Sequence, residues 1–332
     1  MDARERQLLN GFQRDFPLGV EPYALVADAL GVTQDWVLAS LRRFIDDGVV
    51  SRVGAIFRPG TVGASTLAAI AVPPARLADV ARSVSAHAGV NHNYEREHRF
   101  NLWFVANARD EDALRVLLAR IERETVLPVV ALPLVREYRI DLGFDLDGPA
   151  QGGVPEVEVL RPRRALDPVQ QRIVAALEPG LPLVSRPFAA IARRAGLARA
   201  DGESHVLRAL DEWLGEGTVK RFGVIVRHRP LGFVANAMAV WDVPDADVDA
   251  AGHALAAATG VTLCYRRARG LPAWPYNLYC MMHGRERVAV DSALDAIGRR
   301  LGLDAYPHAR LFSRMAFKQR GAIHFDTATV DG

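Results

Sequence analysis

The chain is short of several residue types, and each shortage excludes a class of protein. Cysteine occurs only twice in 332 residues, as Cys264 and Cys280, so neither a disulfide framework nor a Cys-x-x-Cys motif can form. No apolar run approaches the ~20 residues that cross a bilayer, and the charged, amphipathic residues 1–16 are unlike a signal peptide. We therefore expect a cytoplasmic protein that does not bind a membrane.

A strong net charge is also missing. The formal net charge is +2, from 41 Lys and Arg against 39 Asp and Glu, so no overall field attracts nucleic acid. No Gly-x-Gly-x-x-Gly after a strand, Walker A or His-Glu-x-x-His motif occurs, and no Cys/His cluster has structural-zinc spacing. A nucleotide-binding or zinc enzyme is therefore not expected, and no metal site is predicted.

What the chain does contain is the same unit twice. Residues 49–63 (VVSRVGAIFRPGTVG) recur 169 positions later as 218–232 (TVKRFGVIVRHRPLG), and 100–103 (FNLW) match 276–279 (YNLY). A solenoid is excluded, because its repeats are only ~20–50 residues long. We interpret the chain as a fused pseudo-dimer, in which any site between the copies has two non-identical walls.

Each half is predicted to begin with a winged helix-turn-helix. Gly31 and Val32 form a tight turn between two helices, Thr33 is a suitable N-cap, and an extended wing follows Gly48. The expected helices cover residues 3–16, 22–30 and 33–47 in the first half, and 168–177, 186–195 and 203–214 in the second.

After each head, a βαββαβ pattern predicts a ferredoxin-like domain. The fold class is therefore α+β, a tandem duplication of winged helix-turn-helix plus ferredoxin-like units, which resembles the Lrp/AsnC regulators. The expected divisions are a first winged head at 1–52, a first ferredoxin-like domain at 53–144, a Gly/Pro-rich linker at 145–166, a second winged head at 167–222 and a second ferredoxin-like domain at 223–325.

DNA binding by these heads is not expected. Recognition helices need basic side chains against phosphate. Residues 33–47 carry three aspartates against two arginines, and residues 201–217 carry five acidic side chains against one arginine. We expect the heads to pack against each other or against the sheet domains.

The densest polar stretch, residues 92–103, lies on the hairpin between the two central strands of the first half. Strand periodicity predicts that His92, Tyr94, Arg96 and His98 share one face, with Asn93, Glu95 and Glu97 on the other. Two imidazoles, a phenol and a guanidinium suit the binding of an anionic ligand and proton transfer. The alternative is a solvated hairpin with a charged tip, which we prefer for Glu95 and Arg99.

The second copy differs at this hairpin. It keeps a Tyr and an Arg, but it has no His at the place of His98 and carries five inserted residues before the shared aromatic-Asn-Leu-aromatic motif. Arginine and aromatic side chains together suit a large, flat, anionic ligand. The alternative is a rigid loop whose Trp274 covers the core. His283, alone at a strand end, is interpreted as structural.

The strings VNHNYEREHRFNLWF, TLCYRR, WPYNLYCMMHG and FKQRG resemble the siroheme decarboxylases, over essentially residues 1–325. The two halves look like two partner subunits joined in one chain, an arrangement that looks more like the haem d1 branch than the haem branch. The resemblance implies removal of the C12 and C18 acetate carboxylates of siroheme, giving 12,18-didecarboxysiroheme and carbon dioxide. No added organic cofactor is implied, since siroheme brings its own iron.

If the chain carries out this reaction, the chemistry of the hairpin residues suggests a hypothesis for their roles. His98 or Tyr94 is expected to deliver a proton to the methylene carbon, and Arg96 to position an acetate. His92 is expected near the iron. The expected substrate-binding residues are His92, Asn101, Tyr265, Arg266, Arg267, Trp274 and Asn277. One site acting twice is favoured, because the second copy lacks a counterpart of His98.

Other functions stay open from the sequence alone. The chain could instead be an Lrp/AsnC-type transcriptional regulator, a tetrapyrrole-binding sensor without turnover, or a scaffold that hands siroheme to another enzyme. A homodimer of the fused chain, formed by sheet-edge pairing, is a further expectation.

Overall fold

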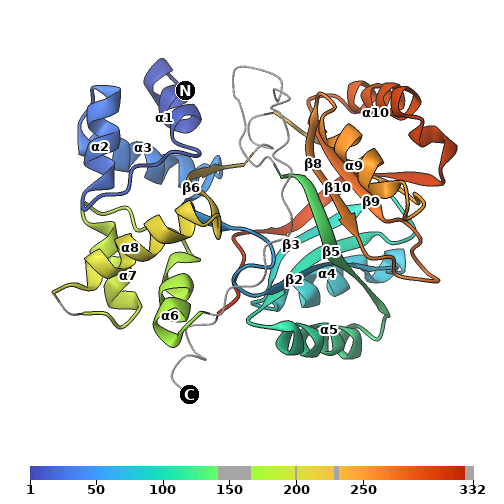
Figure 1. Ribbon diagram of the computed structural model, residues 1–332, viewed down its shortest axis with the longest axis horizontal. Coiled ribbons are helices and arrows are strands. Elements are labelled where there is room, and N and C mark those ends of the chain that lie inside the picture. Colours follow the sequence, from blue (N-terminus) through green and yellow to red (C-terminus); the bar gives the residue numbers. More distant parts are fainter. Residues whose placement is uncertain (141–165, 199, 228–231, 326–332) are drawn as a thin grey trace.

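The protein has a helical part and a β-barrel part (Figure 1). The computed structural model describes residues 1–140, 166–198, 200–227 and 232–325, so the predicted linker lies, except for Leu166, outside the described residues. The head elements are α1 (Ala3–Gly11), α2 (Pro22–Leu30), α3 (Gln34–Asp46) and β1 (Val50–Phe57), then α6 (Pro168–Leu177), α7 (Pro187–Arg194), α8 (Gly202–Gly215) and β6 (Val219–Val226).

Local sequence explains the head helices. The Thr33 side chain accepts a hydrogen bond from the Trp36 N–H and caps α3, as predicted. Gly31 ends α2 in the left-handed conformation at φ 63°. The predicted helix 3–16 was too long, because the chain beyond Gly11 bonds to β6 instead: the Phe16 N–H donates to Phe222 O.

Within the described ranges, no single helix is long and apolar enough to cross a membrane. Helices α2 and α3 reach that length and composition only as a pair, and they are bent by 100° at the break between them.

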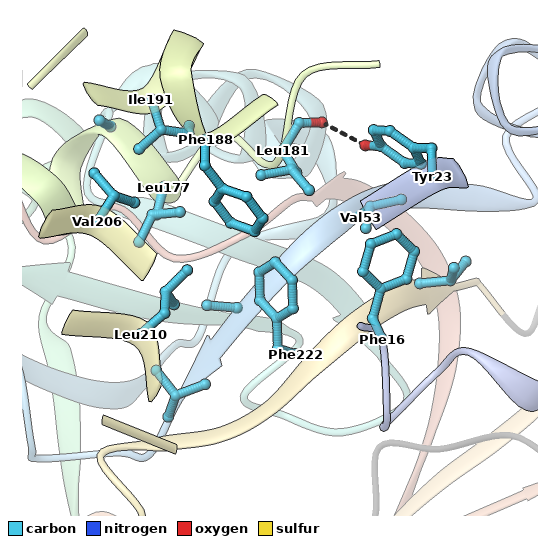
Figure 2. Close-up of a cluster of buried hydrophobic side chains, with 14 of the residues drawn as sticks. Phe16, Tyr23, Val53, Leu177, Leu181, Phe188, Ile191, Val206, Leu210 and Phe222 are labelled. Atoms are coloured by element: carbon cyan, nitrogen blue, oxygen red, sulfur yellow. Dashed lines mark hydrogen bonds between the residues drawn. The ribbon is translucent and has the colours of Figure 1, made fainter. Parts of the chain in front are cut away.

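The two heads pack against each other. β1 and β6 form a two-stranded antiparallel sheet in which Gly54 lies opposite Gly223, its own repeat equivalent, so a pseudo-twofold axis passes between them. Side chains of both halves share one core (Figure 2). Across it, the Tyr23 hydroxyl reaches Leu181 O at 3.5 Å and Pro182 O at 3.1 Å. One of the two expected packing modes is therefore confirmed.

The second part is a closed barrel with the strand order β10-β3-β4-β2-β5-β8-β9-β7. Its strands are β2 (Ala64–Ile70), β3 (Val90–Arg96), β4 (Leu102–Ala108), β5 (Val129–Ile140), β7 (Ala235–Trp241), β8 (Val261–Arg267), β9 (Leu278–Gly284) and β10 (His308–Gln319). The helices are α4 (Leu77–Ala86), α5 (Glu111–Thr125), α9 (Val248–Ala256) and α10 (Arg287–Leu301), with short 3₁₀ turns η1 (Pro74–Arg76) and η3 (Leu303–Ala305).

Two long strands join the halves into one barrel. β5 pairs with β2 through residues 129–133 and with β8 of the second half through 134–140. β10 likewise pairs with β7 through residues 308–312 and with β3 of the first half through 313–319. Each half therefore has the predicted βαββαβ order, but its last strand is longer than expected because it continues into the sheet of the other half.

Three apolar clusters stabilise this part. One lies between α4, α5 and the sheet of the first half, and one between α9, α10 and the sheet of the second. The third fills part of the barrel interior with side chains from both halves, among them Trp103, Tyr265, Trp274 and Tyr279. The α+β fold of two Lrp/AsnC-like units is thus present, and its barrel interior is formed by both copies.

The crossing of β5 gives a stability prediction. Tyr138 on β5 packs on α9 of the other half, and its hydroxyl donates to Asp249 at 2.5 Å. A Cβ added at Gly252 of α9 would overlap the Tyr138 ring, whereas at Gly298 of α10 nothing beyond the helix lies within 4 Å.

We expect Gly252→Ala to lower the free energy of unfolding by about 1–3 kcal/mol, through overpacking. Gly298→Ala, the matched helical control, should raise it by about 0.4–1 kcal/mol, because alanine loses less backbone entropy on folding. Urea denaturation followed by circular dichroism measures both. Equal stability of the two variants would contradict the packing described for Tyr138.

Candidate active site

Polar side chains of the first hairpin enter the barrel interior. Tyr94 on β3 lies opposite Trp103 of the interior cluster, and His92 lies opposite Val105 on the same face. The rings of His92 and Tyr94 stack with centroids 6.0 Å apart. Arg96 follows, with its Cζ 5.7 Å from the Tyr94 ring centroid. The predicted shared face is therefore confirmed for these three residues.

Residues on the opposite face of β3 have different partners. Asn93 donates to Ala81 O and Ser85 Oγ of α4, both at 3.0 Å. Glu97, just beyond the strand, accepts two hydrogen bonds from Arg287, which hold the pKa of its carboxyl below the ordinary value. The alternation of faces was therefore predicted correctly for these two residues, and they take no part in the interior group.

The second half repeats the Tyr–Arg pair inside the barrel. Tyr265 lies opposite Tyr279, and both belong to the interior cluster. The Arg267 Cζ lies 4.6 Å from the Tyr265 ring centroid, and its Nη1 donates to Leu132 O of β5 at 2.8 Å. In the same way, Arg96 Nη1 donates at 3.0 Å to a carbonyl of β10. Each arginine is thus held by the crossing strand of the opposite half.

His98 lies just beyond β3, where the hairpin turns. Its Nδ1 accepts a hydrogen bond from the Phe100 N–H at 3.0 Å, so the neutral ring carries its proton on Nε2. Burial, with a smaller contribution from Arg99, lowers the pKa of His98 below its ordinary value of 6.5. The ring therefore favours the neutral form at neutral pH.

Trp274 occupies in the second half the place of His98. It stands three residues before Asn277, as His98 stands three before Asn101, and the two rings meet at 5.2 Å between centroids. Trp274 is buried against Trp103 at 4.9 Å. The structure matches the alternative of a loop whose Trp274 covers the core, and a substrate contact for this ring stays a prediction.

Three other expected site residues lie outside the interior group. Arg266 points to the opposite face from its strand neighbour Arg267 and donates to Asp245 at 2.8 Å, so a substrate contact for Arg266 stays a prediction. Asn101 accepts from the Val72 N–H and donates to Val72 O, both at 2.9 Å. Asn277 bonds the backbone of Val243 in the same way, at 3.0 and 2.9 Å. These amides fix the chain after β2 and β7, which explains their recurrence in both halves.

Two residues of the second half join the first-half group and were missed. Arg96 approaches Asn236 Oδ1 of β7 at 3.5 Å, and Asn236 Nδ2 lies 3.0 Å from His283 Nε2 of β9. His283 was interpreted as structural because it stands alone in the sequence. Nothing in the sequence marked Asn236 as a site residue, since only the register of β10 against β3 and β7 brings these residues together.

Metal ligands and cysteine thiols are the other side chains that could carry out chemistry. Within the described ranges, no group of three or more His, Cys, Asp or Glu side chains could hold a metal ion. Cys264 and Cys280 are buried, and burial raises the pKa of Cys280 to about 12. A thiolate nucleophile is therefore not favoured at Cys280.

The class of protein follows from family matches to both parts. The AsnC-like ligand binding domain matches residues 61–139 and 230–318. The siroheme decarboxylase NirDL-like HTH domain matches residues 5–50. The chain is thus an AsnC-like protein with a winged head of the decarboxylase type.

Relatives along the full chain define the family. A siroheme decarboxylase NirDL subunit of Paracoccus pantotrophus is 45% identical over 99% of this chain and 99% of its own length. A siroheme decarboxylase of Hydrogenobacter thermophilus is 33% identical over 94% of this chain and 92% of its own length. The chain belongs to the siroheme decarboxylase family and is therefore an enzyme of the carboxy-lyase class.

Solved structures agree with this family. The crystal structure of the siroheme decarboxylase NirDL has a TM-score of 0.70 at 28% identity, covering 99% of this chain and 96% of that one. A crystal structure of the siroheme decarboxylase NirDL in co-complex with an iron-uroporphyrin III analogue has a TM-score of 0.69 at 26% identity, covering 99% of this chain and 95% of that one.

The scaffold role of Asn101 can be tested by an isosteric change. In Asn101→Asp, one carboxylate oxygen can still accept from the Val72 N–H, but the other faces Val72 O without a proton. We expect a loss of about 1–3 kcal/mol in the free energy of unfolding. Gln7→Glu, the same change at an exposed site on α1, should stay within about 0.5 kcal/mol. Urea denaturation distinguishes them, and an unchanged Asn101→Asp midpoint would contradict the scaffold role.

Proposed function

We propose that this chain removes the C12 and C18 acetate carboxylates of siroheme, giving 12,18-didecarboxysiroheme and two carbon dioxide molecules, in haem d1 biosynthesis. Membership of the siroheme decarboxylase family supports the reaction. The observation that carries the site is the interior group of the first half, where an arginine, a phenol and an imidazole lie together on β3. No added organic cofactor is proposed, since the iron arrives with the substrate.

Arg96 is proposed to hold the acetate that leaves. A guanidinium matches a carboxylate in geometry and charge, but a full bidentate grip would stabilise the ground state and slow the reaction. One Arg96 nitrogen already donates to Leu311 O, which limits that grip. When the C–C bond breaks, the electron pair passes to the methylene carbon and into the conjugated macrocycle. One proton then restores a methyl group.

The proton donor is His98 or Tyr94, as expected from the sequence. The lowered pKa of His98 leaves little imidazolium at neutral pH, and protonation of Nδ1 would remove its bond from the Phe100 N–H. Tyr94 lies between His92 and Arg96 and needs no prior protonation. The pH dependence of turnover separates the two donors.

The second half is proposed to bind rather than to react. Tyr265 and Arg267 repeat the pair that holds a carboxylate, whereas Trp274 replaces His98. One site that decarboxylates twice, with the substrate rebinding in between, fits this division. His92 is proposed near the iron, because an imidazole is a suitable ligand for it.

We propose that the heads bind no DNA, since β1 and β6 pair with each other and α8 carries more acidic than basic side chains. A homodimer of the fused chain stays a prediction. Such a dimer could not form by pairing at an edge of the barrel sheet, because every described barrel strand is already paired on both sides. If the protein retarded promoter DNA in a gel-shift assay at physiological salt, the alternative function as a transcriptional regulator would be favoured.

The function is tested by anaerobic incubation of the pure protein with siroheme, followed by mass spectrometry. We expect loss of the mass of two carbon dioxide molecules over many turnovers. His98→Gln and Tyr94→Phe should each retain siroheme binding, measured by the absorbance of the bound chromophore. The variant that lacks the proton donor should lose about 10²–10⁴-fold in kcat, the usual contribution of general acid catalysis. Bound but unchanged siroheme with the wild-type protein would favour the sensor.

The pH profile gives a further prediction. If the His98 imidazolium is the donor, kcat/KM falls as pH rises through a pKa below 6.5, because the imidazolium is lost. This fall in kcat/KM with rising pH should be absent from the His98→Gln variant. If Tyr94 is the donor, kcat/KM stays flat across this range in the wild type. A falling limb that persists in His98→Gln would exclude His98 as its origin.

A further inference from the structure

A chain of hydrogen bonds runs from Arg96 into the second half. Asn236 Oδ1 lies 3.5 Å from Arg96 Nη1, and Asn236 Nδ2 lies 3.0 Å from His283 Nε2. His283 Nδ1 lies 3.0 Å from Thr262 Oγ1, which donates to Met281 O at 3.0 Å. The side chains of Arg96, Asn236 and Thr262 are all buried.

The two ends of this chain fix its direction. A guanidinium can only donate and a backbone carbonyl can only accept. Since the Thr262 hydroxyl gives its one proton to Met281 O, it must accept from His283. His283 therefore carries its proton on Nδ1 and accepts from Asn236 at Nε2. Asn236 is then left with its oxygen toward Arg96.

Reversal of any member brings two donors together. If His283 carried a proton on Nε2, its N–H would face the amide N–H of Asn236, and the amide would have to rotate. Its NH₂ group would then face the Arg96 guanidinium, and the buried contact would become repulsive. The state of His283 thus determines whether Asn236 can hold Arg96.

We propose that Asn236 and His283 are positioning residues for Arg96, with His283 acting as the neutral Nδ1–H imidazole through the Asn236 amide. The second half thereby orients the carboxylate-binding arginine of the first. The kinetic consequence rests on the proposed function, in which Arg96 holds the departing acetate.

The corresponding position in the first half provides a matched control. Ser65 on β2 lies opposite Asn107, as Asn236 on β7 lies opposite His283. Arg267 is flanked by rings instead, with its Cζ 4.6 Å from the Tyr265 centroid and 5.9 Å from that of Tyr279.

A double-mutant cycle tests the proposal on the full-length protein with siroheme. We expect Asn236→Ala to lower kcat/KM about tenfold, the effect of one hydrogen bond to a charged group. In an Arg96→Ala background, the same change should alter kcat/KM less than about twofold, because the two residues act as one unit. Ser65→Ala should leave kcat/KM unchanged. Equal losses from Asn236→Ala in both backgrounds would overturn the proposal.

Variants of His283 test the direction of the chain. Glutamine can accept from Asn236 through its oxygen and donate to Thr262 through its nitrogen, so His283→Gln should stay within about twofold of wild type. His283→Leu should match the loss of Asn236→Ala. Thermal melts identify any variant that fails to fold.

A measurement without turnover separates this proposal from the proposed function. The ¹⁵N chemical shifts of the His283 imidazole should show a proton on Nδ1 and none on Nε2. A proton on Nε2 would overturn the proposed chain of hydrogen bonds, even if the protein decarboxylates siroheme. Absence of turnover with an Nδ1–H ring would overturn the proposed function and leave the hydrogen-bond chain in place.

Discussion

The exchange of strands β5 and β10 between the halves is the constraint on which the rest of the structure depends. A four-stranded sheet with one covered face leaves its other face and both edges open. Here each half extends its last strand into the sheet of the other, so that the barrel closes and the inner faces become a shared interior. Closure also places a carbonyl of each crossing strand within reach of the arginine from the opposite half.

The backbone of the two halves follows the pseudo-twofold symmetry, but the side chains proposed for catalysis do not. Gly54 and Gly223 pair with each other on the axis, and each half places a Tyr–Arg pair inside the barrel. At the hairpin turns, an imidazole on one side meets an indole on the other. The halves also differ beside the two arginines, where Asn236 and His283 of the second half correspond to Ser65 and Asn107 of the first.

The sequence predicted the fold well because its signals were local or repeated. The Thr33 cap, the Gly31 turn and the alternation on β3 each depend on near neighbours, and the repeat identified the second copy of each element. The end of α1 was missed because residues 12–16 bond to β6, which lies far along the chain. The crossing parts of β5 and β10 were missed for the same reason.

The site was only partly predictable. Alternation placed His92, Tyr94 and Arg96 on one face, because period-2 geometry is a property of any strand. It could not bring in Asn236 and His283, since their position depends on long-range register. The recurrence of Asn101 and Asn277 could not distinguish a ligand group from a structural one, because a residue that fixes the backbone recurs as faithfully as one that binds substrate.

The crossing strands also determine when the site can exist during synthesis. Arg96 donates to a carbonyl 215 residues later in the chain. Loop closure over such distances is slow, and unpaired strand edges in the meantime expose the growing chain to aggregation. A ribosome must therefore release nearly the whole polypeptide before the first half gains its interior. Because both units are joined in one chain, the second copy is close to the first when its strands become available for pairing.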